Sequence, residues 1–268
     1  MWKTDLHNHL GSKGANPGFN ATIDLVHSKL GDYSMFGIAN SDDYRFERFV
    51  EQDIRGYERG YFGDNRAVYV PSKNLLVIKC QEMFTKEGHI LAIGMPYSKN
   101  VKSKDAKDAI KEAKDLGAVL SVVHPFYHQG IGKFLQENID ILPEFSTFEA
   151  YNGSAEFSFP PILPTKANFK AASFYSDNLE LFKNYFDAHI GISSATDGHS
   201  VRVIGKCYTE LDLPNDFYHN TNSNLISQLD FSLRSIVSSR KLHMEPNAKD
   251  AAIHAVKMGL VKLGLRSD

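Results

Sequence analysis

The residues of greatest chemical interest stand near the start of the chain, in the run Asp5-Leu6-His7-Asn8-His9. Alternate residues of a β-strand point to the same face, so His7 and His9 would present two imidazoles together. Imidazole nitrogen is a common ligand for borderline divalent metals such as zinc. A lone His-x-His pair is more often two surface histidines than a metal site. Its interpretation therefore depends on whether further ligand types can join it.

Further ligand types do follow, at the ends of later apolar runs. Glu82 follows a strongly apolar run, with His89 seven residues on, and His124 ends another run. Asp197 and His199 repeat the alternate spacing of the first pair. Each has an ordinary explanation alone: a surface charge for Glu82, a core histidine for His124 and a helix cap for Asp197. Their joint placement at successive strand ends favours a metal cluster.

Short β-branched apolar runs alternate with helical stretches along the chain. We expect buried strands near residues 36–39, 75–78, 89–94, 118–123, 147–151 and 189–194. We expect helices at residues 105–116, 178–186, 225–237 and 248–263. This alternation predicts a parallel sheet covered by helices. In α/β barrels the reactive residues gather at the C-terminal ends of the strands, which is where the ligand types fall.

Two segments interrupt the alternation without resembling linkers. Residues 51–72 are aromatic, charged and glycine-containing, as in an excursion from a barrel, and residues 154–168 carry three prolines, as in a loop over one rim. Neither has the composition of an interdomain linker. We therefore expect a single domain over residues 1–268, with residues from about 210 onward forming a C-terminal helical extension packed on the barrel.

The composition is that of an ordinary globular protein. The 268 residues are 42% hydrophobic and 23% charged, with a formal net charge of −2. No global basic field is available to attract nucleic acid or an anionic membrane. Two cysteines argue against a disulfide framework and fit a reducing compartment. The sequence also lacks a signal-peptide pattern and a long apolar run, so we expect a cytoplasmic protein without a membrane partner.

Taken in order, these motifs resemble those of the PHP (polymerase and histidinol phosphatase) family over residues 5–210. The motifs are Asp-Leu-His-Asn-His (5–9), Ser-Asp-Asp (41–43), Glu82 with a later His-Ile-Leu (89–91), Val-His-Pro (123–125), Glu-Ala-Tyr-Asn-Gly (149–153) and Ser-Ala-Thr-Asp-Gly-His (194–199). Both their order and their strand context match. The resemblance implies a distorted (β/α)7 barrel with a metal cluster at its C-terminal face, in a stand-alone metal-dependent phosphoesterase.

The resemblance also implies a set of metal ligands for two to three divalent ions, Zn, Mn or Fe. The first ion would take His7, His9, Glu82 and Asp197. Glu82 would bridge to a second ion, whose other ligands would be His89 and His124. A third ion would use His199 and Asp43.

The third ligand set departs from the family pattern. Most members have Thr-Asp-His where this chain has Ser41-Asp42-Asp43, so an aspartate replaces a histidine. The usual early aspartate is Gly14 here, with the weaker ligand Asn16 nearby. The third set is therefore incomplete, and the negative charge of Asp43 favours Mn or Fe over Zn there.

The expected reaction is hydrolysis of a phosphate ester in a small phosphorylated metabolite or nucleotide. We expect Glu82 and Asp43 to act through the metal ions and His199 to act as general acid to the leaving group. Phosphate also needs cationic contacts, and the candidates are Arg202, Lys206, Arg45, Lys133 and Lys79.

Other functions stay open at this point. A nuclease or exonuclease acting on nucleic-acid ends is the main alternative, against which the near-neutral charge argues. A non-catalytic binding module is another, against which the retained ligand set argues. Related barrels also hydrolyse amides or lactones with similar clusters. The sequence leaves the oligomeric state open.

Overall fold

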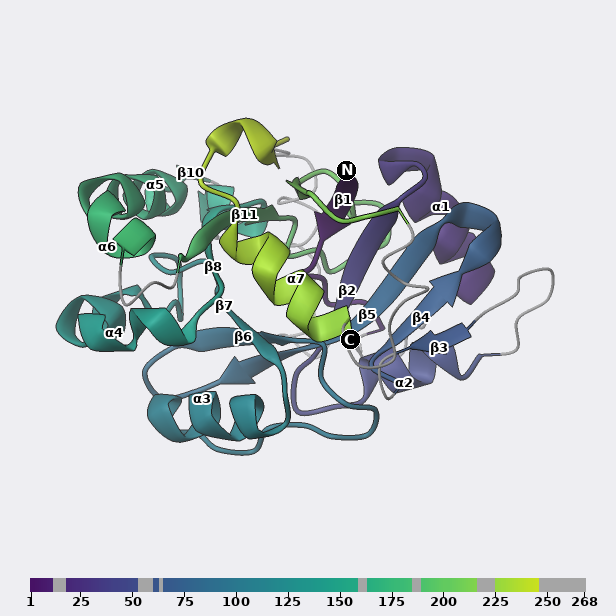
Figure 1. Ribbon diagram of the computed structural model, residues 1–268, viewed down its shortest axis with the longest axis horizontal. Coiled ribbons are helices and arrows are strands. Elements are labelled where there is room, and N and C mark those ends of the chain that lie inside the picture. The colour runs from purple at the N-terminus through teal and green to yellow at the C-terminus, as the bar shows by residue number, and fades with distance from the viewer. Residues whose placement is uncertain are drawn as a thin grey trace.

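The computed structural model describes residues 1–11, 18–52, 60–62, 65–158, 163–184, 189–215 and 225–245. Most strands join one mixed sheet of eleven strands, with the order β11-β8-β7-β6-β5-β2-β1-β12-β13 along its main path (Figure 1). The strands on this path are β1 (Trp2–Asp5), β2 (Ser34–Asn40), β5 (Leu75–Phe84), β6 (His89–Ile93), β7 (Val119–Val122), β8 (Thr147–Asn152), β11 (Gly191–Ala195), β12 (Tyr208–Leu211) and β13 (Leu242–His243).

The sheet nearly closes on itself as a barrel. Beyond the carboxyl ends of β1 and β11, Asn8 and Gly198 form a parallel bridge, and the His9 N–H donates to the Gly198 carbonyl at 2.7 Å. Between β11 and β12, the Thr209 hydroxyl accepts from the Ser194 N–H at 2.8 Å. These contacts join the two ends of the strand path. The α/β barrel expected from the sequence is therefore confirmed.

The sheet is mixed rather than parallel as expected, because β12 is antiparallel to β1, β4 (Ala67–Val70) is antiparallel to β5, and one strand between β11 and β2 is reversed. β6 is antiparallel to both β5 and β7, whereas the other neighbouring pairs from β11 to β2 are parallel. The connection between Phe84 and His89 is too short for a crossover helix, so the chain must turn back as a hairpin. Because His89 pairs with Phe84, the start of β6 lies at the same sheet edge as the end of β5.

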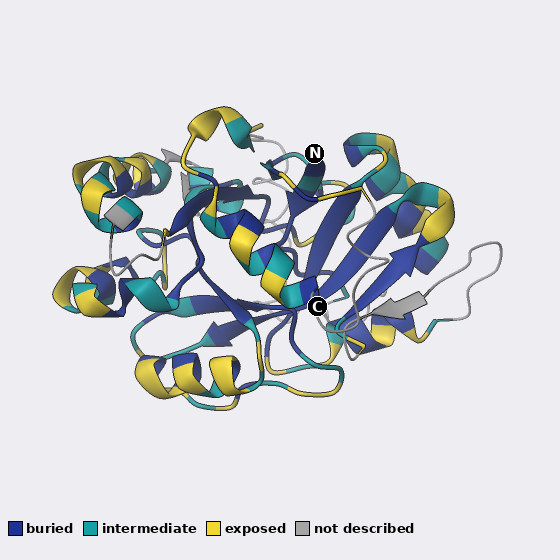
Figure 2. Ribbon diagram, in the orientation of Figure 1, coloured by how far each residue is buried: buried dark blue, intermediate teal, exposed yellow. Residues whose placement is uncertain are grey.

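Helices cover the barrel from outside. They are α1 (Phe19–Leu30), α2 (Arg45–Val50), α3 (Ala106–Asp115), α4 (Gly132–Glu137), α5 (Ala167–Asp177), α6 (Leu179–Asn184) and α7 (Leu225–Arg234). Short 3-10 turns are η1 (Pro71–Lys73), η2 (Ile139–Glu144), η3 (Ser154–Glu156) and η5 (Ser239–Lys241). Each longer helix turns a buried stripe inward and exposed residues outward (Figure 2). Helices α3, α6 and α7 match predicted segments, whereas α1, α2, α4 and α5 were not predicted. The expected helix at 248–263 lies outside the described residues.

Helix α3 shows how local sequence sets these elements. The Asp105 carboxylate accepts hydrogen bonds from the Lys107 and Asp108 N–H groups, which satisfies two donors at the helix start. Ala106, Ala109, Ile110 and Ala113 form its buried stripe. Gly117 follows with φ +71°, a conformation that glycine adopts without steric cost. The helix therefore begins and ends close to where the sequence predicted.

The two interruptions are additions to the barrel. In the first, β3 (Gly60–Phe62) and β4 (Ala67–Val70) form an antiparallel branch on β5. In the second, β9 (Phe157–Ser158) and β10 (Leu163–Pro164) form a separate two-stranded sheet. Residues 53–59, 63–64 and 159–162 of these segments lie outside the described residues. Among the helices that the structure describes, none is long and apolar enough to cross a membrane.

Candidate metal centre

Two histidines follow β1 and face each other. His7 is fully buried and His9 is 4% exposed, and their Nε2 atoms lie 3.2 Å apart. Two nitrogens at this distance cannot both carry a proton toward each other, so one must accept or both must share a cation. The alternate spacing in the sequence thus corresponds to a pair of converging side chains.

Glu82 lies between two groups of histidines. On one side its Oε2 is 3.1 Å from His9 Nε2. On the other, its Oε1 is 2.8 Å from His89 Nδ1 and 2.9 Å from His124 Nε2. His89 reaches Glu82 because β6 runs antiparallel to β5, so the first residue of β6 lies beside the last residue of β5. At their closest contacts the two carboxylate oxygens therefore face different histidines, and Oε1 also lies 3.7 Å from His7 Nε2.

His124 and Asp197 hold their positions through unusual backbone conformations. Their φ angles are +29° and +52°, in the left-handed region that costs non-glycine residues about 1–3 kcal/mol. Each residue lies two positions beyond the end of a strand, β7 for His124 and β11 for Asp197. Asp197 Oδ1 lies 3.5 Å from His9 Nε2 and 3.7 Å from His7 Nε2. Strain of this kind is typical of functional sites.

Four overlapping groups of three residues bring their ligand atoms within 4.8 Å of one another and could each hold a metal ion. The groups are His7, His9 and Glu82; Glu82, His89 and His124; His7, His124 and Asp197; and His9, Asp197 and His199. Seven of the eight residues predicted as ligands are thus brought together. His199 is the exposed member, and its ring stacks on that of His9 with centroids 4.8 Å apart.

Asp43, the eighth predicted ligand, is placed differently and belongs to none of these groups of described residues. Its Oδ2 accepts from Arg45 Nε at 2.8 Å and from Arg48 Nη2 at 3.3 Å, and its Oδ1 accepts from the Ser41 N–H at 3.1 Å. Arg45 in turn reaches the cluster, with Nη1 3.0 Å from His9 Nδ1. Gly14 and Asn16 lie outside the described residues.

The cluster is electrostatically balanced between carboxylates and histidines. Burial opposes ionisation of Glu82, yet the charge of His9 and hydrogen bonds from His124 and His89 hold its pKa well below the usual range. Burial likewise opposes ionisation of Asp197, but His7 and His9 lower its pKa to about 2. Burial lowers the pKa of His7, and Asp197, Glu149 and Glu82 outweigh this and raise it to about 10. The anions therefore stay ionised and require a proton or a metal cation beside them.

Two buried carboxylates support the cluster, and sequence reasoning assigned neither of them a role. Glu149 Oε1 faces His7 Nδ1 at 3.4 Å, while Oε2 accepts from the His124 N–H at 2.7 Å and from Asn152 Nδ2 at 2.8 Å. A carboxylate on one imidazole nitrogen turns the other nitrogen toward a metal. The signal available in the sequence was a glutamate inside the apolar run 147–150.

Asp5 is the second supporting carboxylate. It is fully buried, and it accepts from the Thr196 N–H at 3.0 Å, the Thr196 hydroxyl at 2.6 Å and the Gly205 N–H at 2.8 Å. These bonds tie β1 to the segment that carries Asp197 and His199. Asp5 therefore fixes the distance between the first histidine pair and the last two ligands.

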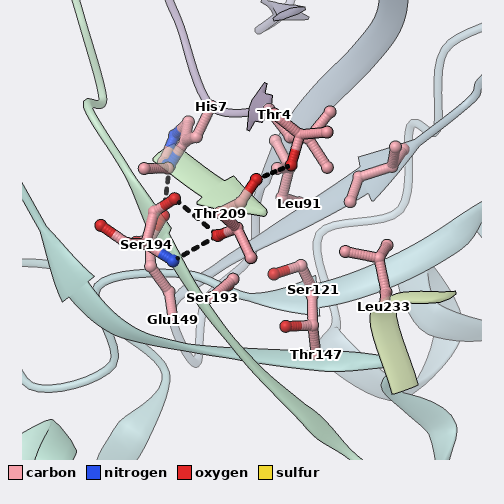
Figure 3. A pocket seen from close by; sticks show the side chains of 13 residues that line it. Thr4, His7, Leu91, Ser121, Thr147, Glu149, Ser193, Ser194, Thr209 and Leu233 are labelled. Carbon is pink, nitrogen blue, oxygen red and sulfur yellow. Dashed lines mark hydrogen bonds and ion pairs between the residues drawn. The ribbon is translucent and has the colours of Figure 1, made fainter. Parts of the chain in front are cut away.

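The barrel interior beneath the cluster is nearly filled. Figure 3 shows His7 and Glu149 together with a ring of hydroxyl side chains around a small cavity. The space open to the centre of a water molecule is about 10 Å³, room for roughly one water. Thr147 Oγ1, which lines this cavity, has no hydrogen-bond partner among the described residues. The cavity has room for no more than about one water, and we call the surface around His199, the exposed member of the cluster, the mouth of the barrel.

The predicted cationic residues lie in different surroundings. Lys79 is fully buried and pairs with Glu47 at 2.5 Å, and Lys133 is 88% exposed beside Glu137. Arg202 is exposed near the mouth, and the Lys206 ammonium lies 4.0 Å from a Glu245 carboxylate oxygen. Arg45, in contrast, directly contacts a histidine of the cluster.

Comparisons with known proteins bear mainly on the fold. The sequence matches no family model and no curated protein. Among solved structures the chain is similar to PsfC from Pseudomonas syringae, with 13% identity, a TM-score of 0.52, and coverage of 99% of this chain and 98% of that one. A Bacteroides vulgatus two-domain protein, which contains a predicted PHP-like metal-dependent phosphoesterase, aligns at 20% identity and a TM-score of 0.43. That alignment covers 74% of this chain and 52% of the other, so the chain spans about half of that protein. The likeness to PsfC is one of overall fold along nearly the whole of both chains.

Proposed function

We propose that this protein is a metal-dependent hydrolase that releases phosphate from a small phosphorylated metabolite or nucleotide. The observation that carries the proposal is the position of the Glu82 carboxylate. One oxygen lies 3.1 Å from His9 Nε2, and the other lies within 2.9 Å of both His89 and His124. A carboxylate placed in this way would bridge two ions, as the proposed two-metal site requires.

The donor set fits divalent transition metals. Imidazole nitrogens and carboxylate oxygens suit Zn, Mn and Fe, and the cluster contains no cysteine. The fit is also electrostatic, because His7 and His9 converge beside two ionised, buried carboxylates. His7, His9, Asp197 and Glu82 would hold one ion, and Glu82, His89 and His124 a second.

When bound, two such ions lower the pKa of a water and neutralise charge on a phosphoryl group. The protein's own residues orient the metal ligands. Glu149 holds His7 with Nε2 toward the cluster, and Asp5 holds the segment that carries Asp197. His199 is the exposed histidine at the mouth, where a leaving group departs, and it donates the proton to that group.

A small substrate fits better than a long nucleic acid. The net charge of −2 gives no attraction to a polyanion. A non-catalytic binding module fits less well, because such a module has no use for a bridging carboxylate and strained ligand positions.

The direct test is metal analysis of the purified protein together with a phosphate-release screen over sugar phosphates, nucleotides and bisphosphates. Glu82→Gln is the matched loss-of-function variant, and Glu137→Gln, which changes an exposed glutamate, is its control. We expect at least two ions per chain in the wild type, and phosphate release that Glu82→Gln abolishes. A metal-replete protein that releases no phosphate from any member of the screen would refute the proposal.

A further inference from the structure

Both oxygens of the Asp43 carboxylate accept from nitrogen donors. Oδ2 accepts from Arg45 Nε at 2.8 Å and from Arg48 Nη2 at 3.3 Å, while Oδ1 accepts from the Ser41 N–H at 3.1 Å. The side-chain pair with Arg45 is the more sheltered of the two, with Arg45 15% and Arg48 42% exposed. Asp43 therefore binds a guanidinium group rather than standing free as a metal ligand.

Arg45 is held in place from two sides. Its Nε is bound to Asp43, and its Nη1 lies 3.0 Å from His9 Nδ1. It stands at the start of α2, which is fixed by the buried pair between Glu47 and Lys79 and by the hydrogen bond from the Phe46 N–H to the Asn40 side chain. The guanidinium is thus a preorganised positive charge at the edge of the cluster.

A third metal ion does not fit beside this pair. An ion held by Asp43 and His199 would have to displace Arg45 from Asp43, or stand next to a permanent positive charge in a partly buried site. The third ion that the sequence analysis assigned to Asp43 therefore disagrees with the arrangement of the described residues. The group of His9, Asp197 and His199 shares two of its three members with the ligands of the first ion, so without Asp43 only His199 would be left as a further ligand.

We propose that the Asp43–Arg45 pair takes the place of a third metal ion, so that a guanidinium supplies the additional positive charge that binds the substrate phosphoryl group. This inference rests on the proposed phosphoesterase function. Arginine suits the role because its planar fork can bond Asp43 through one N–H and a phosphate oxygen through another.

The hydrogen-bond partner of Arg45 Nη1 depends on whether His9 binds a metal ion. A histidine that gives Nε2 to a metal keeps its proton on Nδ1, and that N–H cannot accept from Arg45 Nη1. With His9 Nε2 on an ion, Arg45 Nη1 would be free to bond an anion, while the bond from Nε to Asp43 would still hold the guanidinium in place. The ring of His9 stacks on exposed His199, so the released donor lies near the mouth through which a substrate enters. Phosphate should consequently bind well only to the metal-loaded protein.

The test measures metal stoichiometry and binding of inorganic phosphate, and it requires no turnover. The variants are Arg45→Met, Arg45→Lys and Asp43→Asn. Arg48→Met is the matched control, because Arg48 bonds the same carboxylate but is more exposed and also donates to the Gly11 carbonyl. Circular dichroism establishes that each variant is folded, and Arg45→Lys keeps a charge at the position should Arg45→Met fail to fold.

We expect the ions at the two-ion core to remain bound in every variant, and no ion to be lost in Asp43→Asn. Phosphate affinity should fall about 10-fold or more in Arg45→Met, since the variant loses a charge-assisted hydrogen bond to the anion. It should fall less in Arg45→Lys and Asp43→Asn, and by less than about threefold in Arg48→Met, as for other exposed pairs.

Three results would overturn the inference. They are an ion in the wild type that disappears in Asp43→Asn, a phosphate affinity that Arg45→Met leaves unchanged, and a metal-loaded wild type that binds no phosphate. The ester-hydrolysis screen is separate. If phosphate binds as expected but no ester is cleaved, the hydrolase proposal fails while the Asp43–Arg45 pair stands as an anion site.

Discussion

Glu149→Gln offers a sharp test of how the cluster is positioned, because the substitution keeps shape and removes charge. The carboxylate accepts from two donors at Oε2, the His124 N–H and Asn152 Nδ2, and faces His7 Nδ1 with Oε1. A glutamine has a single oxygen. Placed at the Oε2 position, that oxygen keeps two of the three bonds, whereas the reverse orientation keeps one. The amide nitrogen should therefore face His7 Nδ1.

That orientation sets two donors against each other. His7 can avoid the clash only by moving its proton to Nε2, the nitrogen that faces His9 and the metal position. Loss of such a supporting carboxylate typically costs about 10–100-fold in metal affinity, or about 1.4–2.8 kcal/mol. The strained backbone at His124, which Glu149 also anchors, should stay in place because its N–H keeps an oxygen partner.

The assay is competition with a chelator of known affinity on wild type, Glu149→Gln and Glu144→Gln. Glu144 is an exposed glutamate paired with Lys114, so its variant controls for loss of one negative charge. A metal affinity for Glu149→Gln within about twofold of the control would refute the reasoning, because it would mean that the tautomer of His7 does not depend on Glu149.

Three further predictions follow from the same contacts. Glu82→Gln should lose metal from both ligand groups together rather than from one, since both share its oxygens; metal content by elemental analysis tests this, and loss of a single ion would argue against a bridge. In metal-free protein, the raised pKa of His7 contributes stability that is present below about pH 6.5 and lost as pH rises through about 10. The difference in Tm between wild type and His7→Gln should therefore shrink over that interval. A constant difference would show that His7 is neutral in the fold. Asp5→Asn should lower kcat more than it lowers the affinity for inorganic phosphate, because it loosens the segment that carries His199 and leaves Arg45 untouched. An equal loss in both would mean that Asp5 merely stabilises the fold.

The sequence by itself singled out seven of the residues that the structure brings together in the cluster. Alternate spacing predicted that His7 and His9 point together, and they do although both lie beyond the end of β1. The position of Glu82, His124 and Asp197 after apolar runs predicted a common edge. These inferences depend on local periodicity, which the backbone imposes within a few residues. The barrel followed for the same reason, since alternating strands and helices have few ways to pack.

Only the tertiary structure decided how those residues are joined. The direction of β6, which brings His89 to Glu82, depends on pairing with β5 and β7. The ion pair of Asp43 with Arg45 depends on where α2 is held, and that position is set by a buried lysine far along the chain, Lys79, which sequence reasoning had considered as a phosphate contact. A charged side chain takes its role from the partners that surround it, and those partners are brought together only by folding.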